Sequence, residues 1–429
     1  MRDQLLDVDL QYGTGSLTVS GLPRARTTVV EPRHLPSVAD EAKVVTAALR
    51  EPVAGPPLRS CIRPGQTVAI SVCDGTRPQP REVVIPAILA ELDGLARRED
   101  IVILIATGTH RGNSDAELRA MLGDEVVDSV RIENHDARDE STLRFVGHVG
   151  NGVPLWLNRT WLDADVRITT GFVEPHFFAG FSGGPKMIAP GLAGLETTLV
   201  LHDAARIGSR QARWGVLEGN PVHDDIRAIA RHCPPDFSLD VVLDGHKRVG
   251  QAFGGELFAM HEAAVAVSRA TAMCPVPAAF DVVVTSNAGF PLDQNLYQAV
   301  KGMSAAAQVV KPGGTIVIAA ECRDGFPDHG SYRSELVGAS SPVALLEQIA
   351  ARPRTVADQW QIQIQAKIQQ HARVLVHTSF LSDAELAAAH LEQVPDVSEA
   401  VHAALAESGP DATVCVLPWG PLAVPYLSD

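Results

Sequence analysis

Short apolar runs alternate with amphipathic stretches along the first half of the chain, and this rhythm constrains the fold more than any other feature. Strands are expected at 66–73, 101–107 and 166–172, and helices at 81–92 and 114–122. Ser114 suits the cap of the second helix. Buried strands separated by helices are typical of a parallel sheet covered by helices, so we predict an α/β fold.

A second pattern of the same kind begins after a break near 273–280. Its expected elements are strands at 281–289, 313–320, 372–379 and 412–418, with a helix from Asp293 to about Val310. Because one core rarely serves 429 residues, we predict two α/β domains with mainly parallel sheets and a cleft between them. An N-terminal cofactor-binding domain would cover 1–272, joined by 410–429, and a C-terminal domain would cover 276–409.

Composition excludes several classes of protein. The chain carries 51 acidic against 36 basic side chains, and this balance argues against general binding of nucleic acid or its phosphates. No apolar run reaches the roughly 18 residues of a membrane span. Acids in residues 1–13 stand where a signal peptide needs an apolar core, so we expect a cytoplasmic protein. The six cysteines form no C-x-x-C pair and suit buried thiols in a reducing compartment.

The stretch Glu174–Gly191, EPHFFAGFSGGPKMIAPG, combines features that ordinary loops do not share. Its four Gly and three Pro are too many for a long helix, and its three Phe make it too apolar for a solvated loop. The backbone of Ser182–Gly184 could satisfy its amides by wrapping an anion or cofactor, with Lys186 beside it. The alternative is a tight turn that leads into a helix. His176 and Lys186 together favour a functional site.

A second polar loop, DGTRPQP at 74–80, follows a predicted strand. Asp74 and Thr76 can hydrogen-bond a ribose or another hydroxyl group, and Arg77 offers a bidentate fork to a carboxylate or phosphate. The alternative is a simple turn that Asp74 caps, with Arg77 in solvent.

Two histidines also follow predicted strands, His110 in the turn GTHRGN and His176 in the glycine-rich stretch. A lone histidine at a strand end is more often structural or exposed than catalytic. Ligands of parallel sheets bind at the carboxyl ends of the strands, however. Two imidazoles at that edge therefore suggest proton transfer at two faces of one carbon or oxygen.

The other candidates lie further along the chain. His202 follows on an expected helix, and its spacing alone suggests a surface histidine. No HExxH or Cys–His cluster accompanies it, so the protein alone does not predict a metal cage. Gln298 and Lys301 share a helix face that Asp293 would cap, although a solvated amphipathic helix has the same pattern. Trp360 lies in a glutamine-rich helix, where it would pack between domains or line a cleft.

Taken together, these motifs resemble the nickel-dependent lactate racemase family, whose members use a nickel pincer nucleotide. The resemblance covers nearly the whole chain, and it depends on the order and spacing of YGTGSLTVSGLP, DGTRP, ATGTHR, GFVEPHFFAGFSGGPKMIAPG, the HD at 202–203, YQAVKG and LPWGP. It implies an isomerase that racemises or epimerises a small 2-hydroxy acid, with cofactor biosynthesis proteins as partners in maturation.

The resemblance also implies roles for single residues. Lys186 resembles the lysine that attaches covalently to a thiocarbonyl group of the cofactor. His202 resembles the protein ligand of nickel, whose other donors are two sulfurs and a carbon of the pincer. His110 and His176 resemble the two acid/base histidines. The implied substrate-binding residues are Arg77, Lys301, Gln298, Tyr297 and Trp360, and the residues implied to hold the cofactor's ribose and phosphate are Asp74, Thr76, Ser182, Gly183 and Gly184.

In the implied reaction, one histidine removes the hydroxyl proton while the α-hydride passes to the cofactor, and the resulting 2-keto acid takes the hydride back on its other face. Phe177, Phe178 and Phe181 would keep water out. The family often has His at the position of Gly75, and the smaller residue would widen the pocket or alter the nucleotide contact. Lactate, larger 2-hydroxy acids and an aldonate epimerised at C2 therefore all stay open as substrates.

A protein of another class is a further alternative. The segment SGGPK could cradle a phosphate in a nucleotide-binding, phosphoryl-transfer protein, with Lys186 as its cation. The order G-x-x-x-x-G-K-[ST] is absent, however, because Pro185 separates the glycine from the lysine. The sequence leaves the oligomeric state open.

Overall fold

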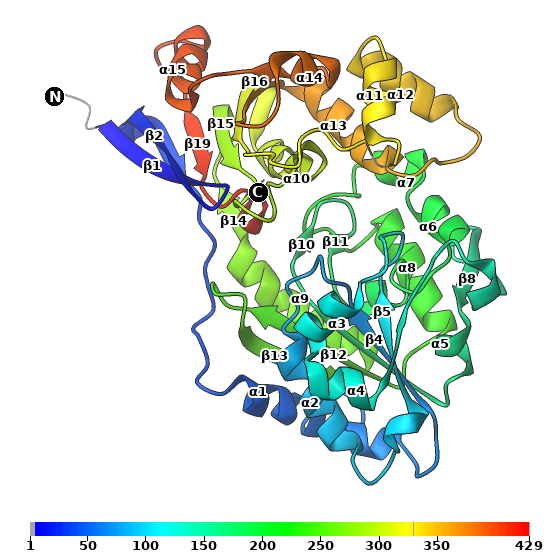
Figure 1. The fold of residues 1–429 in the computed structure, drawn as a ribbon. Helices are drawn as coiled ribbons and strands as arrows, with labels where there is room; N and C mark the ends of the chain where they lie inside the picture. Colours follow the sequence, from blue (N-terminus) through cyan, green and yellow to red (C-terminus); the bar gives the residue numbers. More distant parts are fainter. Residues whose placement is uncertain (1–4, 329, 429) are drawn as a thin grey trace. The chain divides into compact units, whose positions relative to one another are not determined.

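The structure is a computed structural model that describes residues 5–328 and 330–428, so the first four residues of the acidic N-terminal segment lie outside the described residues. The chain forms two compact units, whose elements are labelled in Figure 1. The N-terminal unit consists of residues 34–201 and 210–270, and the C-terminal unit consists of residues up to 33, 202–209 and the chain from 271 onward. Both units are α/β with mainly parallel sheets, so the predicted fold class is confirmed.

A six-stranded sheet forms the centre of the N-terminal unit, in the order β13-β12-β9-β4-β5-β6. Its strands are β4 (Val68–Cys73), β5 (Ile101–Ala106), β6 (Arg131–Asn134), β9 (Val166–Phe172), β12 (Phe237–Leu243) and β13 (Val249–Gly255). Neighbouring strands are parallel except for β12 and β13. Every residue of β4 is buried, because helices cover both faces of a parallel sheet of this kind.

Helices and small hairpins complete the N-terminal unit. The helices are α1 (Glu41–Arg50), α2 (Arg81–Leu92), α3 (Asp115–Leu122), α4 (Asp124–Ser129), α5 (Arg159–Asp163), α6 (Leu195–Leu201), α8 (Pro221–His232) and α9 (Leu257–Ala272), and the hairpins are β7 (Leu143–Val149) with β8 (Val153–Asn158) and β10 (Pro175–His176) with β11 (Gly180–Phe181). Ser114 caps α3 as predicted, in a reciprocal capping box with Glu117. Ile70, Ile88 and Ile103 are fully buried in the aliphatic core.

The C-terminal unit has its own six-stranded sheet, in the order β18-β17-β16-β15-β19-β3, and all its neighbours are parallel. Its strands are β3 (Thr27–Val29), β15 (Phe280–Ser286), β16 (Val310–Ala319), β17 (Arg373–His377), β18 (Glu392–Gln393) and β19 (Val414–Leu417). Two further pairs are β1 (Leu5–Tyr12) with β2 (Gly15–Pro23) and β14 (Met273–Val276) with β20 (Val424–Leu427). The helices are α7 (Ala204–Gly208), α10 (Leu296–Ala306), α11 (Tyr332–Gly338), α12 (Pro342–Ala351), α13 (Gln359–His371), α14 (Asp383–Ala388) and α15 (Val397–Ser408).

The predicted domain ranges differ from these units at both ends of the chain. The prediction that 410–429 joins the N-terminal domain is wrong, because β19 pairs with β15 in the sheet of the C-terminal unit. Strand β3 pairs with β19 on the other side, so the first described residues also belong to the C-terminal unit. An apolar strand pattern indicates burial on both faces, but it does not identify the neighbouring strands.

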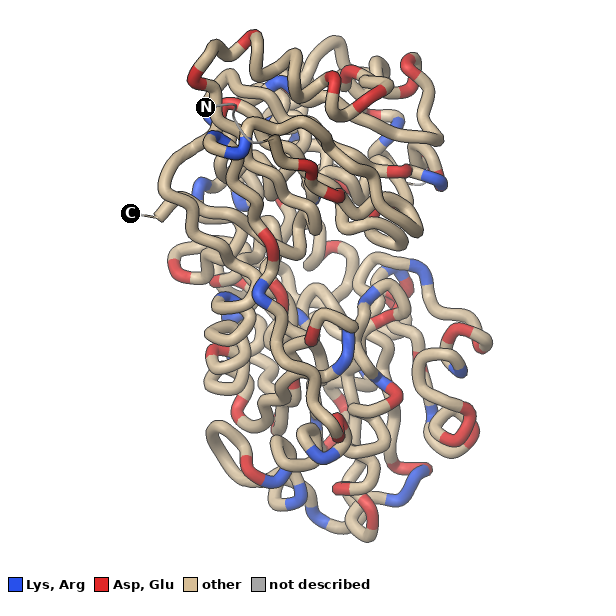
Figure 2. The backbone as a smooth tube through the Cα atoms, turned by 90° about the vertical axis from the view of Figure 1, so that its left-hand side faces the viewer, with Lys and Arg blue, Asp and Glu red and all other residues tan. Residues whose placement is uncertain are grey.

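Three general properties complete the description. Across residues 5–328 and 330–428, every helix is too short or too polar to span a bilayer. All six cysteines are free thiols, and all except the half-buried Cys61 are buried. Lys and Arg are interspersed with Asp and Glu along the backbone (Figure 2).

Replacing Leu417 by Ala tests whether the end of the chain belongs to the C-terminal core. Leu417 is fully buried in β19, so the cavity should lower the free energy of unfolding by about 3 kcal/mol in urea titrations followed by circular dichroism. Leu427 is 48% exposed in β20, and its replacement by Ala should cost less than about 1 kcal/mol. Equal effects of the two changes would contradict the placement of β19.

Candidate functional site

Three neighbouring parallel strands of the N-terminal unit are followed, at their carboxyl ends, by loops that carry polar residues. The strands lie in the order β9-β4-β5. Cys73, the last residue of β4, is paired with Ala106, the last residue of β5, so the loops after these two strands begin side by side. Asp74 follows β4, His110 follows β5, and the glycine-rich stretch follows β9. The predicted arrangement of these loops at one edge of the sheet therefore occurs in the structure.

Asp74 and His110 form a hydrogen-bonded pair that joins the first two loops. Asp74 Oδ2 lies 2.7 Å from His110 Nδ1, and Asp74 Oδ1 accepts bonds from the backbone N–H and the hydroxyl of Thr76. Burial opposes ionisation of Asp74, but the bonds from His110 and Thr76 and the charge of Arg77 hold the pKa of its carboxyl below the usual value. An ionised carboxylate only accepts hydrogen bonds, so Nδ1 of His110 carries a proton.

The bond to Asp74 therefore leaves a lone pair on Nε2 of neutral His110. The Asp74 side chain is 4% exposed, whereas that of His110 is 47% exposed. The imidazole can accept a proton from outside while the carboxylate behind it stabilises the resulting imidazolium. This arrangement suits a general base.

Arg77 is held by residues that the sequence did not single out. Arg81 is buried at the start of α2, and both terminal nitrogens of its guanidinium donate to the carbonyl of Arg77, at 3.0 and 3.1 Å. Gln79 accepts from the N–H of Cys73 and donates to Thr170 Oγ1. The turn is therefore fixed by side chains within its own RPQPR sequence.

The glycine-rich stretch folds as the β10–β11 hairpin followed by one 3-10 turn, Gly184–Met187. Ser182 closes the hairpin, since its hydroxyl donates to the carbonyl of Phe172 and accepts from the N–H of Glu174, both at 2.9 Å. The backbone N–H of Ser182 donates to the Glu174 carbonyl. The N–H of Gly184 donates to Asp240 Oδ2, at 2.6 Å.

These bonds change the interpretation of the loop as an anion cradle. The amides of Ser182 and Gly184 are used inside the protein, so they do not wrap a ligand. Gly183 and Gly184 have positive φ, and an added Cβ would lie 2.6 Å from Asp240 and 2.5 Å from the ring of His261. The glycines are thus required by the buried side chains beneath them.

His261 and Asp240 support this turn from below. His261 Nε2 lies 2.9 Å from the carbonyl of Ser182 and so donates to it. Burial lowers the pKa of His261 to about 4 and that of the neighbouring His223 to about 3, so both imidazoles are neutral at pH 7. Burial raises the pKa of Asp240 to about 7. A carboxyl group in the apolar strand FSLDVVL was the available sequence signal for Asp240.

His176 has the opposite tautomer from His110. Its Nδ1 accepts from the backbone N–H groups of Phe178 and Ala179, at 3.5 and 3.3 Å, so the proton of the neutral ring is on Nε2. The rings of Phe177 and Phe178 pack against the imidazole, with centroids at 5.0 and 4.5 Å. In the neutral rings, Nε2–H of His176 can therefore donate a hydrogen bond, whereas Nε2 of His110 can accept a proton.

Lys186 lies on the 3-10 turn and is half-buried. Its Nζ is 6.0 Å from the centroid of the Phe178 ring. The carbonyl of the next residue, Met187, accepts from the hydroxyl of Ser71 in β4, at 2.9 Å. The backbone around Lys186 is therefore tied to the central strand of the sheet.

The remaining predicted residues lie in the C-terminal unit. Lys301 Nζ donates to Gln298 Oε1 on α10, at 2.8 Å, so the predicted shared helix face is observed. Tyr297 on the same helix packs edge-on against Tyr332, and the amide of Gln361 donates to the Tyr297 carbonyl. Helix α10 is mostly buried, so its interpretation as a solvated amphipathic helix is wrong.

Two further predictions for this unit need correction. Asn295 caps α10, whereas Asp293 is buried and accepts from the N–H groups of Gly13 and Glu321. His202 lies in the break between α6 and α7 and is 6% exposed, so it is not a surface histidine. Its ring centroid lies 4.7 Å from that of the buried Trp360.

The donor set around His202 is sparse. Within the described residues, no group of three or more His, Cys, Asp or Glu side chains could hold a metal ion. A metal at His202 would therefore need donors from a bound molecule.

Gly75 does not leave open space. A Cβ at this position would lie 2.7 Å from Asn113 Nδ2, so the side chain of Asn113 occupies the volume that a larger residue would need. The expectation that Gly75 widens a pocket is not supported.

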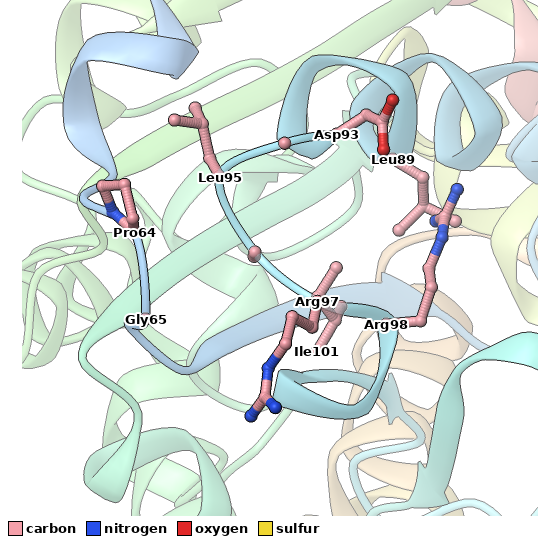
Figure 3. Close-up of a pocket in the computed structure, with 10 residues that line it drawn as sticks. Pro64, Gly65, Leu89, Asp93, Leu95, Arg97, Arg98 and Ile101 are labelled. Carbon is pink, nitrogen blue, oxygen red and sulfur yellow. The ribbon is translucent and has the colours of Figure 1, made fainter.

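The N-terminal unit also has a surface cavity of about 460 Å³ lined by Pro64, Leu89, Arg97 and Arg98 (Figure 3). It adjoins Ile101, the first residue of β5, and so lies at the amino edge of the sheet. Arg97 is paired with Asp100 and Glu99. This cavity is separate from the strand-end loops of the candidate site.

Comparisons with known families match most of the chain. Residues 12–215 match the lactate racemase N-terminal domain, and residues 276–424 match the lactate racemase C-terminal domain. The lactate racemases of Thermoanaerobacterium thermosaccharolyticum and Lactiplantibacillus plantarum are each 36% identical to this chain over 383 residues. Each match covers 89% of this chain, and 89% and 90% of those two proteins respectively.

Solved structures share the fold of this chain. The lactate racemase apoprotein from Thermoanaerobacterium thermosaccharolyticum is similar with a TM-score of 0.92 and 32% identity, over 99% of this chain and 100% of that one. A protein from Thermotoga maritima shares the fold at a TM-score of 0.67 and 18% identity, over 91% and 100% of the two chains.

Asp240 should make stability fall as pH rises. Its pKa is raised from 3.8 to about 7 in the folded protein, so the stability contributed by its protonated form is complete below about pH 4 and is lost as pH rises towards 7. We expect Asp240→Asn to remove this part of the pH dependence of unfolding, measured by urea titrations between pH 4 and 8. Substitution of the exposed Asp93 by Asn is the control, and identical pH profiles for the two variants would refute the assignment.

Proposed function

Because this chain belongs to the lactate racemase family, a family of isomerases, we propose that it interconverts the enantiomers of lactate or a similar short 2-hydroxy acid. The observation that carries the proposal is a pair of histidines whose Nδ1 atoms are both held, in His110 by Asp74 and in His176 by backbone N–H groups. In the neutral rings, Nε2 of His110 can accept a proton and Nε2–H of His176 can donate a hydrogen bond. This combination suits a racemase of 2-hydroxy acids, because the hydroxyl proton must leave while the oxygen that becomes a carbonyl is polarised.

The cofactor we propose is the nickel pincer nucleotide, supplied by biosynthesis proteins. Lys186 would attach to it covalently, and His202 would ligate the nickel. The residues present fit this group, since His202 belongs to no group of three or more His, Cys, Asp or Glu side chains in the described part of the chain, and the pincer supplies its own two sulfurs and carbon. When bound, the cofactor would accept the α-hydride of the substrate and return it.

We assign proton transfer to His110 and polarisation of the substrate oxygen to His176. Nε2 of His110 takes the hydroxyl proton, and Asp74 stabilises the imidazolium. The substrate becomes a 2-keto acid, whose oxygen accepts a hydrogen bond from Nε2–H of His176. The His110 imidazolium returns its proton to that oxygen as the opposite enantiomer forms, and the reverse direction runs the same steps backwards.

The other residues would bind and shield the reactants. Arg77 and Lys301 would hold the substrate carboxylate, with Gln298, Tyr297 and Trp360 nearby. Phe177 and Phe178, which are buried beside His176, together with Phe181 would exclude water from the keto intermediate.

Five predicted cofactor contacts are revised in this proposal. Both oxygens of Asp74 already accept hydrogen bonds, so we assign Asp74 to orienting His110, and Thr76 to supporting Asp74. Ser182, Gly183 and Gly184 would act indirectly, by shaping the turn that presents Lys186.

The alternatives from the sequence receive less support. Phosphoryl transfer needs free amides in the glycine loop, and those of Ser182 and Gly184 are engaged. Epimerisation of a sugar acid was suggested by a small residue at Gly75, whose space Asn113 fills.

Chiral analysis after incubation with D- and L-lactate, malate, 2-hydroxybutyrate, phenyllactate and gluconate tests the substrate directly. Turnover of gluconate alone would refute the choice of a short acid.

Asp74→Asn should lower kcat for lactate racemisation by about 10³-fold. The amide cannot stabilise an imidazolium, and it allows the wrong tautomer of His110. Chiral chromatography of the product measures the rate, and intact mass confirms that the cofactor is attached. Undiminished turnover would contradict the role of Asp74.

Lys186→Ala and His202→Ala should separate attachment from metal binding. Without Lys186, the intact mass after exposure to the cofactor should equal that of the polypeptide. Without His202, the cofactor mass should remain while the nickel content, measured by mass spectrometry of the metal, should fall by at least about tenfold. Retention of the cofactor mass by Lys186→Ala would disprove covalent attachment at this lysine.

A further inference from the structure

Residues 202–209 belong by their contacts to the C-terminal unit, although the chain on either side belongs to the N-terminal unit. The segment consists of His202, the cap residue Asp203, and α7 with Ser209. Helix α7 has only five residues. A helix of this length is not stable by itself in water, because one turn does not offset the cost of nucleation. Contacts from elsewhere must therefore hold the segment in place.

Helix α13 supplies these contacts from one face (Figure 1). Trp360, Gln363 and Lys367 are spaced by three and four residues and so lie on the same side of the helix. The ring of Trp360 packs against His202, as described above. Gln363 Nε2 donates to the carbonyl of Ala204 at 2.9 Å, and Lys367 Nζ donates to the carbonyl of Gly208 at 3.2 Å.

These two hydrogen bonds reach both ends of α7. Ala204 is its first residue and Gly208 its last, and the carbonyl of Gly208 has no partner within so short a helix. A Cβ at Gly208 would lie 3.3 Å from Gln363 Nε2, so the two helices approach closely here. Helix α13 therefore contacts the segment at three residues, His202, Ala204 and Gly208.

The side-chain oxygen of Gln363 is unpaired. Gln363 is buried, and its Oε1 has no hydrogen-bond partner among the described residues. A buried unpaired acceptor is unfavourable, and an apolar side chain of similar size would avoid it. Filling space does not explain a glutamine here, whereas donation to Ala204 does.

We propose that Gln363 is a positioning residue: together with Lys367 it fixes the segment 202–209 and thereby orients the imidazole of His202 for binding nickel. The proposal deepens the proposed function, since it relies on His202 as the metal ligand. Gln363 itself touches neither substrate nor cofactor in this role. Its effect passes through the backbone of Ala204, two residues after the ligand.

Hydrogen exchange of the apoprotein tests the positioning without the cofactor. The reporters are the N–H groups of Arg206, Ile207 and Ser209, which donate to Asp203 or Arg206 within the segment. In Gln363→Met, which removes the donor and the unpaired oxygen together, these amides should exchange about fivefold faster. The overall unfolding midpoint should change little.

Gln369→Met is the matched control. Gln369 lies on the same helix, but its amide donates to the carbonyls of Ala389 and His390 instead. Its substitution should leave exchange in 202–209 unchanged. Equal exchange of the three reporters in wild type, Gln363→Met and Gln369→Met would overturn the proposal.

The loaded enzyme tests the consequence for the metal. Gln363→Met should keep the cofactor mass on Lys186 but lose nickel to a chelator about fivefold faster than Gln369→Met, with an altered visible absorption spectrum. Faster exchange with unchanged nickel loss and spectrum would refute the link to nickel. Nickel binding that survives His202→Ala would instead refute the proposed function itself.

Lys367 provides a second test if Gln363→Met folds poorly. Lys367→Met should loosen the same three amides, whereas Lys367→Arg retains a donor for Gly208 and should behave as wild type. Wild-type exchange in Lys367→Met would remove Lys367 from the proposal.

Discussion

The parallel pairing of β4 with β5 and β9 is the constraint on which the candidate site depends. It brings the loops after Cys73, Ala106 and Phe172 to the carboxyl end of a sheet in which every residue of β4 is buried. The hydrogen bond between Asp74 and His110 is possible only because of this register. A shift of β5 by one residue would turn its side chains to the other face and would separate the carboxylate from the imidazole. The contact between Asp74 and His110 thus results from the pairing of two strands and not from a contiguous sequence motif.

The local surroundings then give the two histidines different chemistry. A carboxylate can only accept, so it fixes the proton of His110 on Nδ1, whereas backbone N–H groups can only donate, so they leave Nδ1 of His176 without one. When both rings are neutral, Nε2 therefore carries a lone pair in His110 and an N–H in His176. In the function we propose, the lone pair takes the hydroxyl proton and the N–H polarises the substrate oxygen.

Much of the fold could be predicted from the sequence, because it follows from local patterns. Helix α2 spans the predicted 81–92, and Ser114 caps α3. The pairing of distant strands could not be predicted, because an apolar run does not indicate which strand lies beside it. Strands β19 and β3 therefore joined the C-terminal sheet against expectation. In the site, motifs located Asp74 and His110, but they could not assign Asp74 as the partner of His110. Arg81, Asp240, His261 and Gln363 were missed, since each acts on a backbone group far away in sequence or inside a turn.

The glycine-rich stretch shows why a ligand site predicted from a sequence motif must be checked against the contacts in the structure. Glycines near a lysine suggest a ligand cradle, because glycine permits close approach by any atom. In this protein the approaching atoms belong to Asp240 and His261, which occupy the space that Cβ atoms at Gly183 and Gly184 would need. A buried carboxyl and a neutral imidazole are costly groups to bury, and they are tolerated here because each is hydrogen-bonded to the loop backbone. Asp240 and His261 therefore fix the backbone of the turn that carries Lys186, the residue that we propose attaches to the cofactor.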